Sequence, residues 1–547
     1  MSMITATAWV PRGAAAAHPQ KYQFDEEEYD RIAQIARHEL ADAKDDLRKA
    51  KQSINTSNEL IDDTDGGVPL PTSNGATADG TSSDDPELAE YDMDRYDEDM
   101  DGAVDSNAES KANNSIFGNI QGLAYYEDAS EDPYLMLPEQ GDASDDDERE
   151  ELQILPTDNL ILTAKVEDEV ACLELLVMEG EQDHLYVHHD VMLPAVPLCV
   201  EWFDFRPNKA SETGNFAAVG TMEADIELWD LDVVDSMFPA AILGQNSQAM
   251  PEAPSEPATK KKRKKSQKVN DAYHVDSVLS LAANRHHRNL LASASADKTI
   301  KLWDLNTCTA AHSYSHHTDK VCALSWHPSQ SSVLLSGSYD RTIVAADMRA
   351  PNATVPRWGV ESDVEQVRWD PHDEHIFYVS TESGMLHCFD TRQLPSSPER
   401  SKAKWRLQAH QKSLSCFSIN PVVPGFIATA STDRTVKLWD VSAVTAAPSM
   451  VVSRDLGVGK VFSANFAPDE AVAFRLAVAG SKGAVQVWDT STNRAVREAF
   501  ATKVRMAGSD VPEERLIGLE RDDEMEEEEE EAAEDGGEGG WESMNED

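Results

Sequence analysis

A Trp-Asp dipeptide, or a close variant of it, recurs along the middle of this chain, and this repeat constrains the fold more than any other feature. The six copies are Trp229-Asp230, Trp303-Asp304, Ala346-Asp347, Phe389-Asp390, Trp439-Asp440 and Trp488-Asp489. Successive aspartates lie 74, 43, 43, 50 and 49 residues apart. The long first interval contains a loop over 244–270 that is rich in Pro, Ser, Ala and Lys, and without these 27 residues it shortens to 47. Internal repeats of this length indicate an array of similar supersecondary units.

Most repeats also contain a short aromatic or apolar segment that is closed by a proline, such as Trp326-His327-Pro328 and Trp369-Asp370-Pro371. Together, the two motifs are the marks of WD40 blades, in which each repeat forms one four-stranded sheet of a propeller. The segment from Ile154 to Met192 contains three alternating apolar runs and is expected to form a degenerate seventh blade. We therefore predict an all-β, seven-bladed WD40 β-propeller over residues 152–500. Either terminal segment could donate the missing strand of the first blade.

The spacing of polar residues predicts which blades carry the hydrogen-bonded tetrad that stiffens WD40 sheets. In three repeats a turn Asp lies six residues before the Trp position, a His lies 23 residues before the Asp, and a hydroxyl lies four residues before it. The two complete tetrads are His274, Ser293, Asp297 and Trp303, and His410, Thr429, Asp433 and Trp439. The third set, His317, Ser336 and Asp340, ends in Ala346, so it can form only a triad in a looser blade. Breaking such a buried Asp–His pair would cost about 3–5 kcal/mol.

The formal net charge of −52 comes mainly from the two ends of the chain. Residues 1–150 carry a net charge of −26 and residues 501–547 carry −15, which leaves −11 for the repeats. We predict that residues 1–52 form an N-terminal extension with an amphipathic helix. Residues 53–151 are acidic and poor in apolar side chains, so they cannot offset the entropy of ordering and are predicted to be largely disordered. The same reasoning predicts a disordered acidic tail over 501–547.

No sequence pattern in the chain carries catalysis. It has no Gly-rich phosphate loop, no GxSxG elbow and no Cys/His spacing suited to zinc, and its six cysteines lie far apart. We therefore predict a protein that is not an enzyme, with no cofactor, no metal and no small-molecule substrate. No run of about 18 apolar residues is present, and the first residues lack the layout of a secretory signal. The sequence thus favours a soluble intracellular protein without a membrane partner.

The one dense basic element lies in the loop over 244–270. It consists of Lys260, Lys261, Lys262, Arg263, Lys264 and Lys265. Six consecutive cations in an exposed loop can be recognised by a nuclear import receptor or can contact RNA phosphates, and these two roles are compatible. The remaining alternative is that the run is only a solvated part of the loop.

A further set of residues near the N-terminus carries a specific resemblance. Trp9-Val10-Pro11-Arg12-Gly13 is followed by Lys21-Tyr22-Gln23-Phe24-Asp25-Glu26-Glu27-Glu28, then Phe117-Gly118-Asn119, then Leu185-Tyr186-Val187-His188-His189-Asp190. With these segments the chain resembles the periodic tryptophan protein 1 family over essentially its whole length. The Trp-Asp repeats alone would match many unrelated propellers, so the N-terminal segment carries most of the resemblance.

The resemblance implies a nucleolar assembly factor for the large ribosomal subunit, located in the nucleus and nucleolus. Its implied partners are the pre-ribosomal particle, with its precursor rRNA, assembly factors and ribosomal proteins, and a nuclear import receptor. A chromatin-associated propeller that binds histone tails is the alternative. The candidate partner-binding residues are Trp9, Val10, Pro11 and Arg12, Ile32 and Ile35 of the expected helix over 24–52, and Ile116 and Phe117. For Trp9 and its neighbours, docking on the flank of the chain's own propeller is the alternative reading.

Overall fold

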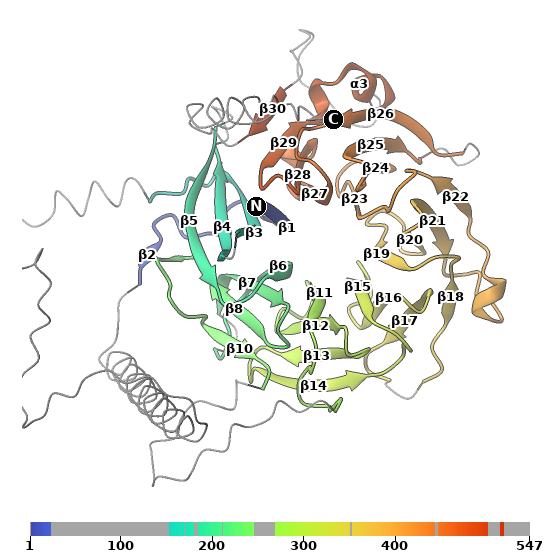
Figure 1. Ribbon diagram of the computed structural model, residues 1–547, viewed down its shortest axis with the longest axis horizontal. Helices are drawn as coiled ribbons and strands as arrows, with labels where there is room; N and C mark the ends of the chain where they lie inside the picture. The colour runs from blue at the N-terminus through green and yellow to red at the C-terminus, as the bar shows by residue number, and fades with distance from the viewer. Residues whose placement is uncertain are drawn as a thin grey trace, which may run out of the picture. The chain divides into compact units, whose positions relative to one another are not determined.

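The computed structural model shows a seven-bladed β-propeller (Figure 1). It describes residues 2–22, 152–168, 170–179, 184–209, 212–245, 268–350, 353–442, 447–500 and 515–518. Each blade is a four-stranded antiparallel sheet, and the first strand of each sheet lines the centre of the ring. The prediction of an all-β, seven-bladed WD40 propeller is therefore confirmed.

The blades follow one another along the chain, and the innermost strand of blade 1 comes from the N-terminal segment. Blade 1 has the order β1 (Ser2–Val10), β3 (Asn159–Glu167), β4 (Val170–Met178) and β5 (Leu185–Leu193). Blade 2 has the order β6 (Pro197–Phe205), β7 (Thr213–Thr221), β8 (Ile226–Asp230) and β10 (Ala241–Leu243). Blade 3 contains β11 (Val278–Ala283), β12 (Leu290–Ser295), β13 (Ile300–Asp304) and β14 (Thr309–Tyr314). Blade 4 contains β15 (Val321–Trp326), β16 (Val333–Ser338), β17 (Thr342–Asp347) and β18 (Arg357–Gly359).

Three blades complete the ring. Blade 5 contains β19 (Val364–Trp369), β20 (Ile376–Thr381), β21 (Met385–Asp390) and β22 (Trp405–Gln408). Blade 6 contains β23 (Cys416–Ile419), β24 (Phe426–Ala430), β25 (Thr435–Asp440) and β26 (Ser449–Asp455). Blade 7 contains β27 (Val461–Phe466), β28 (Arg475–Gly480), β29 (Val485–Asp489) and β30 (Arg515–Gly518). Short elements outside the blades are β2 (Gln20–Lys21), which runs parallel to β9 (Val233–Val234), the helix α3 (Arg494–Phe500), and the 3₁₀ turns η5 (Pro398–Arg400), η6 (Glu470–Val472) and η7 (Thr490–Thr492).

The middle strands of each blade are buried on both faces because a neighbouring blade covers each face. All six residues of β20 and all five residues of β24 are buried. Both strands consist of small, β-branched and aromatic side chains, which suit a pleated surface without solvent contact. The hydrophobic clusters accordingly draw on adjacent blades: Ile4 of β1 packs in the same cluster as Ala477 of β28 and Val485 of β29. The hydrophobic core therefore consists of layers of apolar side chains, each packed between two adjacent blades around the ring.

The repeat boundaries predicted from the sequence are too narrow at both ends. The strand β1 belongs to the predicted N-terminal extension over 1–52, yet it is the innermost strand of blade 1 and pairs along its length with β3. The strand β30 belongs to the predicted tail over 501–547, yet it is the outermost strand of blade 7. The propeller thus takes one strand from each terminal segment in addition to residues 152–500.

Candidate functional site

The N-terminal candidates Trp9 and Val10 lie inside the propeller. Trp9 is 9% exposed and Val10 is 1% exposed. The indole Nε1 of Trp9 donates a hydrogen bond to the main-chain carbonyl of Asn465 in β27, at 2.8 Å. Two further contacts join the same strands, since Thr7 Oγ1 lies 2.8 Å from Ser463 Oγ and Asn465 Nδ2 donates to the carbonyl of Thr7. The interpretation of Trp9 and Val10 as free partner-binding residues is corrected: they close the ring between blades 1 and 7.

Trp9 repeats a contact that occurs elsewhere in the ring. Trp326 Nε1 donates to the carbonyl of Ala282 in the preceding blade, and Trp369 Nε1 donates to the carbonyl of Ser325. All three tryptophans end or nearly end an innermost strand and are followed two residues later by a proline. The motif Trp9-Val10-Pro11 is therefore the same proline-closed motif that marks the other blades. The motif is visible in the sequence, and the pairing of β1 with β3 shows that it belongs to a blade strand.

Arg12 continues this internal docking. Its Nε donates to Asn159 Oδ1 of β3 at 2.8 Å, and its main-chain N–H donates to Asp469 after β27. Arg12 and Pro11 are half-buried, so part of each side chain still meets solvent. The other candidates, Ile32, Ile35, Ile116, Phe117 and the basic run over 260–265, lie outside the described residues.

The predicted tetrad residues come together in blades 3 and 6. In blade 3, His274 Nδ1 lies 2.9 Å from Asp297 Oδ2, His274 Nε2 lies 2.7 Å from Ser293 Oγ, and Trp303 Nε1 donates to the same Oγ at 2.8 Å. In blade 6 the corresponding distances are 2.9, 3.0 and 2.8 Å, among His410, Asp433, Thr429 and Trp439. Each chain of hydrogen bonds links the turn, the loop and the middle strands of one sheet.

Blade 4 carries the shorter version. His317 Nδ1 lies 3.2 Å from Asp340 Oδ2, and its Nε2 lies 2.8 Å from Ser336 Oγ. Ala346 stands where blades 3 and 6 have tryptophan and is buried, so Ser336 receives no indole hydrogen bond. The Ser336 hydroxyl also reaches the carbonyl of Val344, as the Thr429 hydroxyl of blade 6 reaches that of Lys437.

The tetrad aspartates also hold the turn that follows them. Lys298, which follows Asp297, has a φ of 72°, in the left-handed region that normally favours glycine. Asp297 Oδ1 accepts hydrogen bonds from Thr299 N at 2.9 Å and Thr299 Oγ1 at 2.6 Å, which offset this strain. In blade 5, Ser383 stands at the position of Asp297. The next residue, which corresponds to Lys298, is a glycine, Gly384, with a φ of 80°. The same turn is thus stabilised in two chemically different ways.

These networks fix the charge state of their members. Burial alone would raise the pKa of Asp297, but hydrogen bonds from His274 and Thr299 lower it to about 2. Burial lowers the pKa of His274, against the opposing effect of Asp297. At neutral pH the pair is therefore a carboxylate and a neutral imidazole, and both ring nitrogens of His274 are engaged, one by Asp297 and the other by Ser293.

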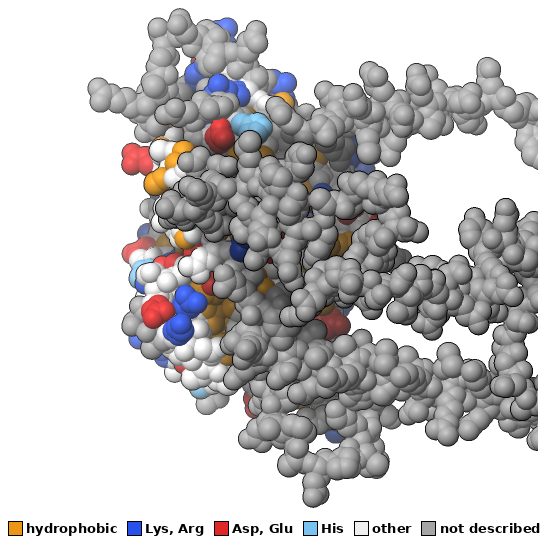
Figure 2. Space-filling model, turned by 90° about the vertical axis from the view of Figure 1, so that its left-hand side faces the viewer, with side chains coloured by type: hydrophobic (Ala, Val, Ile, Leu, Met, Phe, Trp, Pro, Cys, Tyr) orange, Lys and Arg blue, Asp and Glu red, His pale blue; other side chains and the backbone are white. Residues whose placement is uncertain are grey.

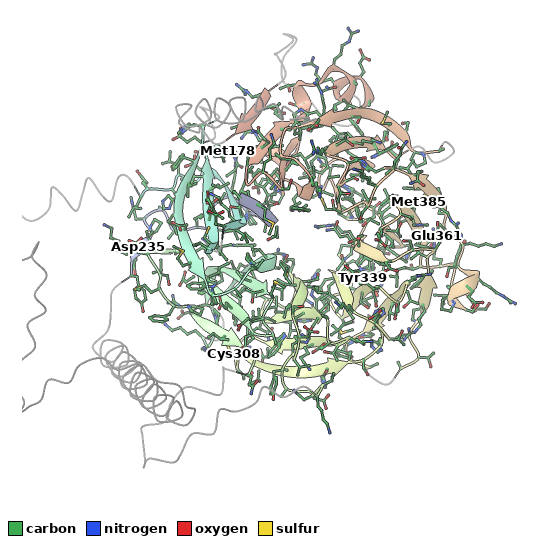
Figure 3. All side chains as sticks on the ribbon, viewed as in Figure 1. Met178, Asp235, Cys308, Tyr339, Glu361 and Met385 are labelled. Carbon is green, nitrogen blue, oxygen red and sulfur yellow. The ribbon has the colours of Figure 1, made fainter. Side chains whose placement is uncertain are left out.

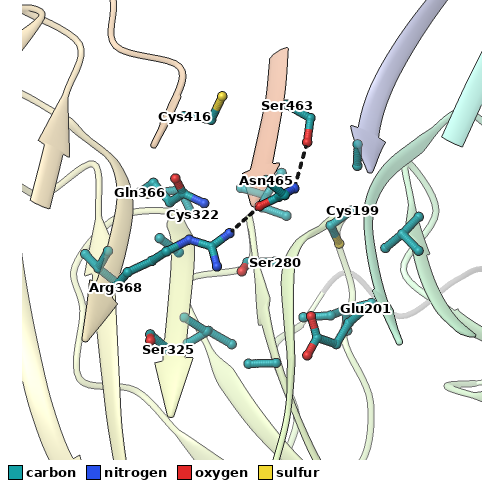
Figure 4. Close-up of a pocket in the computed structure, with 18 of the residues that line it drawn as sticks. Cys199, Glu201, Ser280, Cys322, Ser325, Gln366, Arg368, Cys416, Ser463 and Asn465 are labelled. Atoms are coloured by element: carbon teal, nitrogen blue, oxygen red, sulfur yellow. Dashed lines mark hydrogen bonds between the residues drawn. The ribbon is translucent and has the colours of Figure 1, made fainter. Parts of the chain in front are cut away.

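The centre of the ring contains a channel, a cavity of about 380 Å³ lined by the seven innermost strands (Figure 4). Its walls are built in layers because the strands run in the same direction around the ring. Cys199, Ser280, Gln366 and Ser463 are third residues of their strands, and Glu201, Ser325, Arg368 and Asn465 are fifth residues. The channel was not predicted as a site, because a single repeat does not reveal which of its side chains face the axis.

The two ends of the channel differ in charge. Near the start of β19, burial and the neighbouring Glu382 and Asp363 raise the pKa of Glu365 to about 7, although a hydrogen bond from Ser413 opposes this shift. Tyr339 lies at this inner region of blade 4 (Figure 3), and burial and Glu365 raise its pKa to about 12. Toward the end of β19 the walls carry Arg368, together with Arg285 from the loop after β11.

The remaining described surface is mixed in character. In the side view of Figure 2, acidic and basic side chains lie beside one another on the visible described surface, with hydrophobic side chains between them. No group of three or more His, Cys, Asp or Glu residues in the described part of the chain is arranged to hold a metal ion. Within the same ranges, no helix is both long and apolar enough to cross a membrane.

Comparisons with known proteins extend these observations. The WD domain, G-beta repeat family model matches residues 268–304, 308–345 and 401–440. An uncharacterised WD repeat-containing protein of Schizosaccharomyces pombe is 47% identical over 95% of this chain and 95% of its own length. Periodic tryptophan protein 1 of Saccharomyces cerevisiae is 35% identical over 94% of this chain and 92% of its own length. The periodic tryptophan protein 1 homologue of Drosophila melanogaster is 28% identical over 91% of this chain and 96% of its own.

Proposed function

Because this chain belongs to the periodic tryptophan protein 1 family, we propose that it is a non-enzymatic assembly factor for the large ribosomal subunit. It acts as a propeller scaffold that binds precursor rRNA and other assembly factors on early pre-ribosomal particles in the nucleolus. The observation that carries this proposal is the similarity to Periodic tryptophan protein 1, which extends over 94% of the chain and thus includes the segments outside the repeats.

The closed ring supports a scaffold role on physical grounds. Every blade is packed on both faces, and the ring is closed by side-chain hydrogen bonds between β1 and β27. Such a body presents loops and turns at fixed positions, which suits simultaneous contact with several partners. Because Trp9 and Val10 are interior, the partner contacts of the N-terminal region belong to the expected helix over 24–52 and to the hydrophobic residues Ile116 and Phe117.

The basic run over 260–265 is proposed to direct nuclear import or to contact RNA. The two roles separate experimentally when the five lysines and Arg263 are all replaced by glutamine. Loss of nuclear accumulation identifies import, whereas normal accumulation with reduced ultraviolet crosslinking to RNA identifies RNA contact. Unchanged accumulation together with unchanged crosslinking would leave only the solvated loop.

Sedimentation of cell extract tests the assembly role directly. We expect the protein to co-migrate with large-subunit precursors after nuclease treatment has removed chromatin. A protein that instead sediments with nucleosomes and is absent from those precursors would contradict the proposal and favour the chromatin-associated alternative.

The N-terminal contribution needs a deletion that spares β1. Removing residues 24–52 leaves the inner strand of blade 1 intact and is expected to weaken association with the particle while the melting temperature stays unchanged. Deletion of residues 2–10 is the contrasting variant, and it is expected to destabilise the propeller itself. If the 24–52 deletion leaves particle association unchanged, the proposed partner contact of this segment is wrong.

A further inference from the structure

Two arginines, Arg285 and Arg368, line one end of the central channel, and among the described residues only Arg285 forms an ion pair. Arg285 Nη2 lies 3.2 Å from Glu201 Oε1. Arg285 also covers the ring of Trp202, at 5.0 Å from the ring centroid. Among the described residues, no carboxylate forms an ion pair with Arg368. The charge of this end of the channel is therefore balanced except at Arg368.

Arg368 points into the channel from β19 toward β27 (Figure 4). Its Nη2 donates a hydrogen bond of 3.1 Å to Asn465 Oδ1, and this amide oxygen is an uncharged acceptor. Its Nε is buried without a hydrogen-bond partner in the described part of the chain. Asn465 itself is held in place, because its Nδ2 donates to Thr7 and Ser463. The guanidinium is thus fixed in position while part of its donor set is unused.

This arrangement is unfavourable for a cation without a ligand. Burial lowers the pKa of Arg368, although the charge of Glu201 opposes this shift. An arginine does not lose its proton in proteins, so it cannot relieve the cost of burial by becoming neutral. A buried or partly buried charge is stable only when an opposite charge and hydrogen-bond partners compensate it. The site therefore favours an anionic ligand.

The form of the channel restricts which anion fits. A guanidinium offers two parallel N–H donors that match the two oxygens of a carboxylate. The cavity of about 380 Å³ has room for a side chain, and Ser325 and Gln366 on its walls provide further polar groups. Glu201 on the same layer and Glu365 at the other end oppose a multiply charged phosphate more strongly than a single carboxylate. The chemistry thus favours an acidic side chain over a nucleic-acid backbone.

We propose that the central channel binds an Asp or Glu side chain from an inserted protein segment, with Arg368 as the residue that holds its carboxylate. Asn465 positions the guanidinium, and the paired Arg285 and Glu201 form the wall beside it. The site does not depend on which particle the protein joins, so it stands or falls separately from the proposed ribosomal role.

Calorimetric titration of the full chain with an acidic peptide tests the site. The probe is a peptide with the sequence of residues 522–534, a segment of this chain rich in Asp and Glu, and the matched peptide has every Asp and Glu replaced by Asn and Gln. We expect the acidic peptide to bind and the neutral peptide not to bind. We expect Arg368→Gln to weaken binding at least tenfold, because the carboxylate loses both its charge partner and its donors.

Arg494→Gln is the matched control, since it removes one positive charge from an exposed arginine on α3, far from the channel layer. It should change the affinity less than twofold. If Arg368→Gln unfolds, Arg368→Lys keeps the charge but lacks the planar pair of donors, and it should bind at least threefold more weakly. Equal binding by wild type and the Arg368 variant, no binding of the acidic peptide, or Arg368-dependent binding of oligouridylate in its place would each overturn the proposal.

Discussion

The buried position of Trp9 leads to a prediction that separates its two interpretations. Replacing Trp9 by alanine removes a large side chain that is 9% exposed and packs between blades 1 and 7. Large-to-small substitutions of a buried tryptophan cost about 3–5 kcal/mol, because the surroundings collapse only in part. Trp9→Phe retains most of the apolar surface and removes only the indole N–H, so it should cost about 1 kcal/mol for the lost bond to Asn465.

Guanidinium unfolding of the full chain, followed by far-ultraviolet circular dichroism, measures both effects. The midpoint should fall in the order wild type, Trp9→Phe, Trp9→Ala, while the slope with denaturant stays similar. Met222→Ala is the control, since Met222 is a large apolar side chain that is 63% exposed. If Trp9→Ala shifts the midpoint no more than Met222→Ala, while association with a partner is lost, then Trp9 is a binding residue and the ring closure described above is wrong.

Three other substitutions test the turns and buried groups. Asp297→Ala should lower the free energy of unfolding by about 3–5 kcal/mol in the same denaturant assay. The control Asp319→Ala, at an exposed aspartate, should lower it by less than about 1 kcal/mol. Equal losses for the two variants would contradict the stabilising role of the tetrad. Gly384→Ala places a Cβ against the carbonyl of His410, whereas at nearly the same φ the Cβ of Gly457→Ala meets nothing within 4 Å. Gly384→Ala should therefore melt at a clearly lower temperature than Gly457→Ala. Burial and His188 lower the pKa of His189 to about 4, so the unfolded chain takes up a proton first as the pH falls below about 6.5. Stability should then drop by about 2 kcal/mol between pH 7 and pH 5, and His189→Asn should reduce that drop in urea titrations at the two pH values; an undiminished drop would show that other groups cause it.

Much of the fold could be predicted from sequence because each blade repeats one local pattern. The Trp-Asp spacing and the proline-closed segments locate six blades, and fixed offsets place the tetrad partners His274, Asp297 and Trp303 before any contact is known. These features are local, so a single repeat contains all the information that they need. The same holds for the triad of blade 4, where Ala346 alone predicts the missing indole.

The ring-closing strand and the channel could not be found in this way. The inner strand of blade 1 precedes its neighbour β3 by about 150 residues in sequence, and the resemblance of Trp9-Val10-Pro11 to the other closing motifs becomes decisive only when the strands are paired. Arg368 and Asn465 meet because two blades with different sequences share a layer around the axis. Such a contact depends on closure of the ring, and no spacing within one repeat encodes it.

The closure of the ring also has a consequence for how the chain is assembled during translation. The first strand to leave the ribosome, β1, must wait for β27, so the hydrogen bond from Trp9 to Asn465 spans 456 residues, whereas its counterpart from Trp369 to Ser325 spans 44. Loop-closure entropy grows only with the logarithm of length, so this tenfold longer loop costs about 2 kcal/mol more. Late closure therefore affects the rate of folding far more than the stability of the folded ring. Until blade 7 emerges from the ribosome, the nascent chain is an incomplete ring in which the side chains that later join β1 and β27 are exposed.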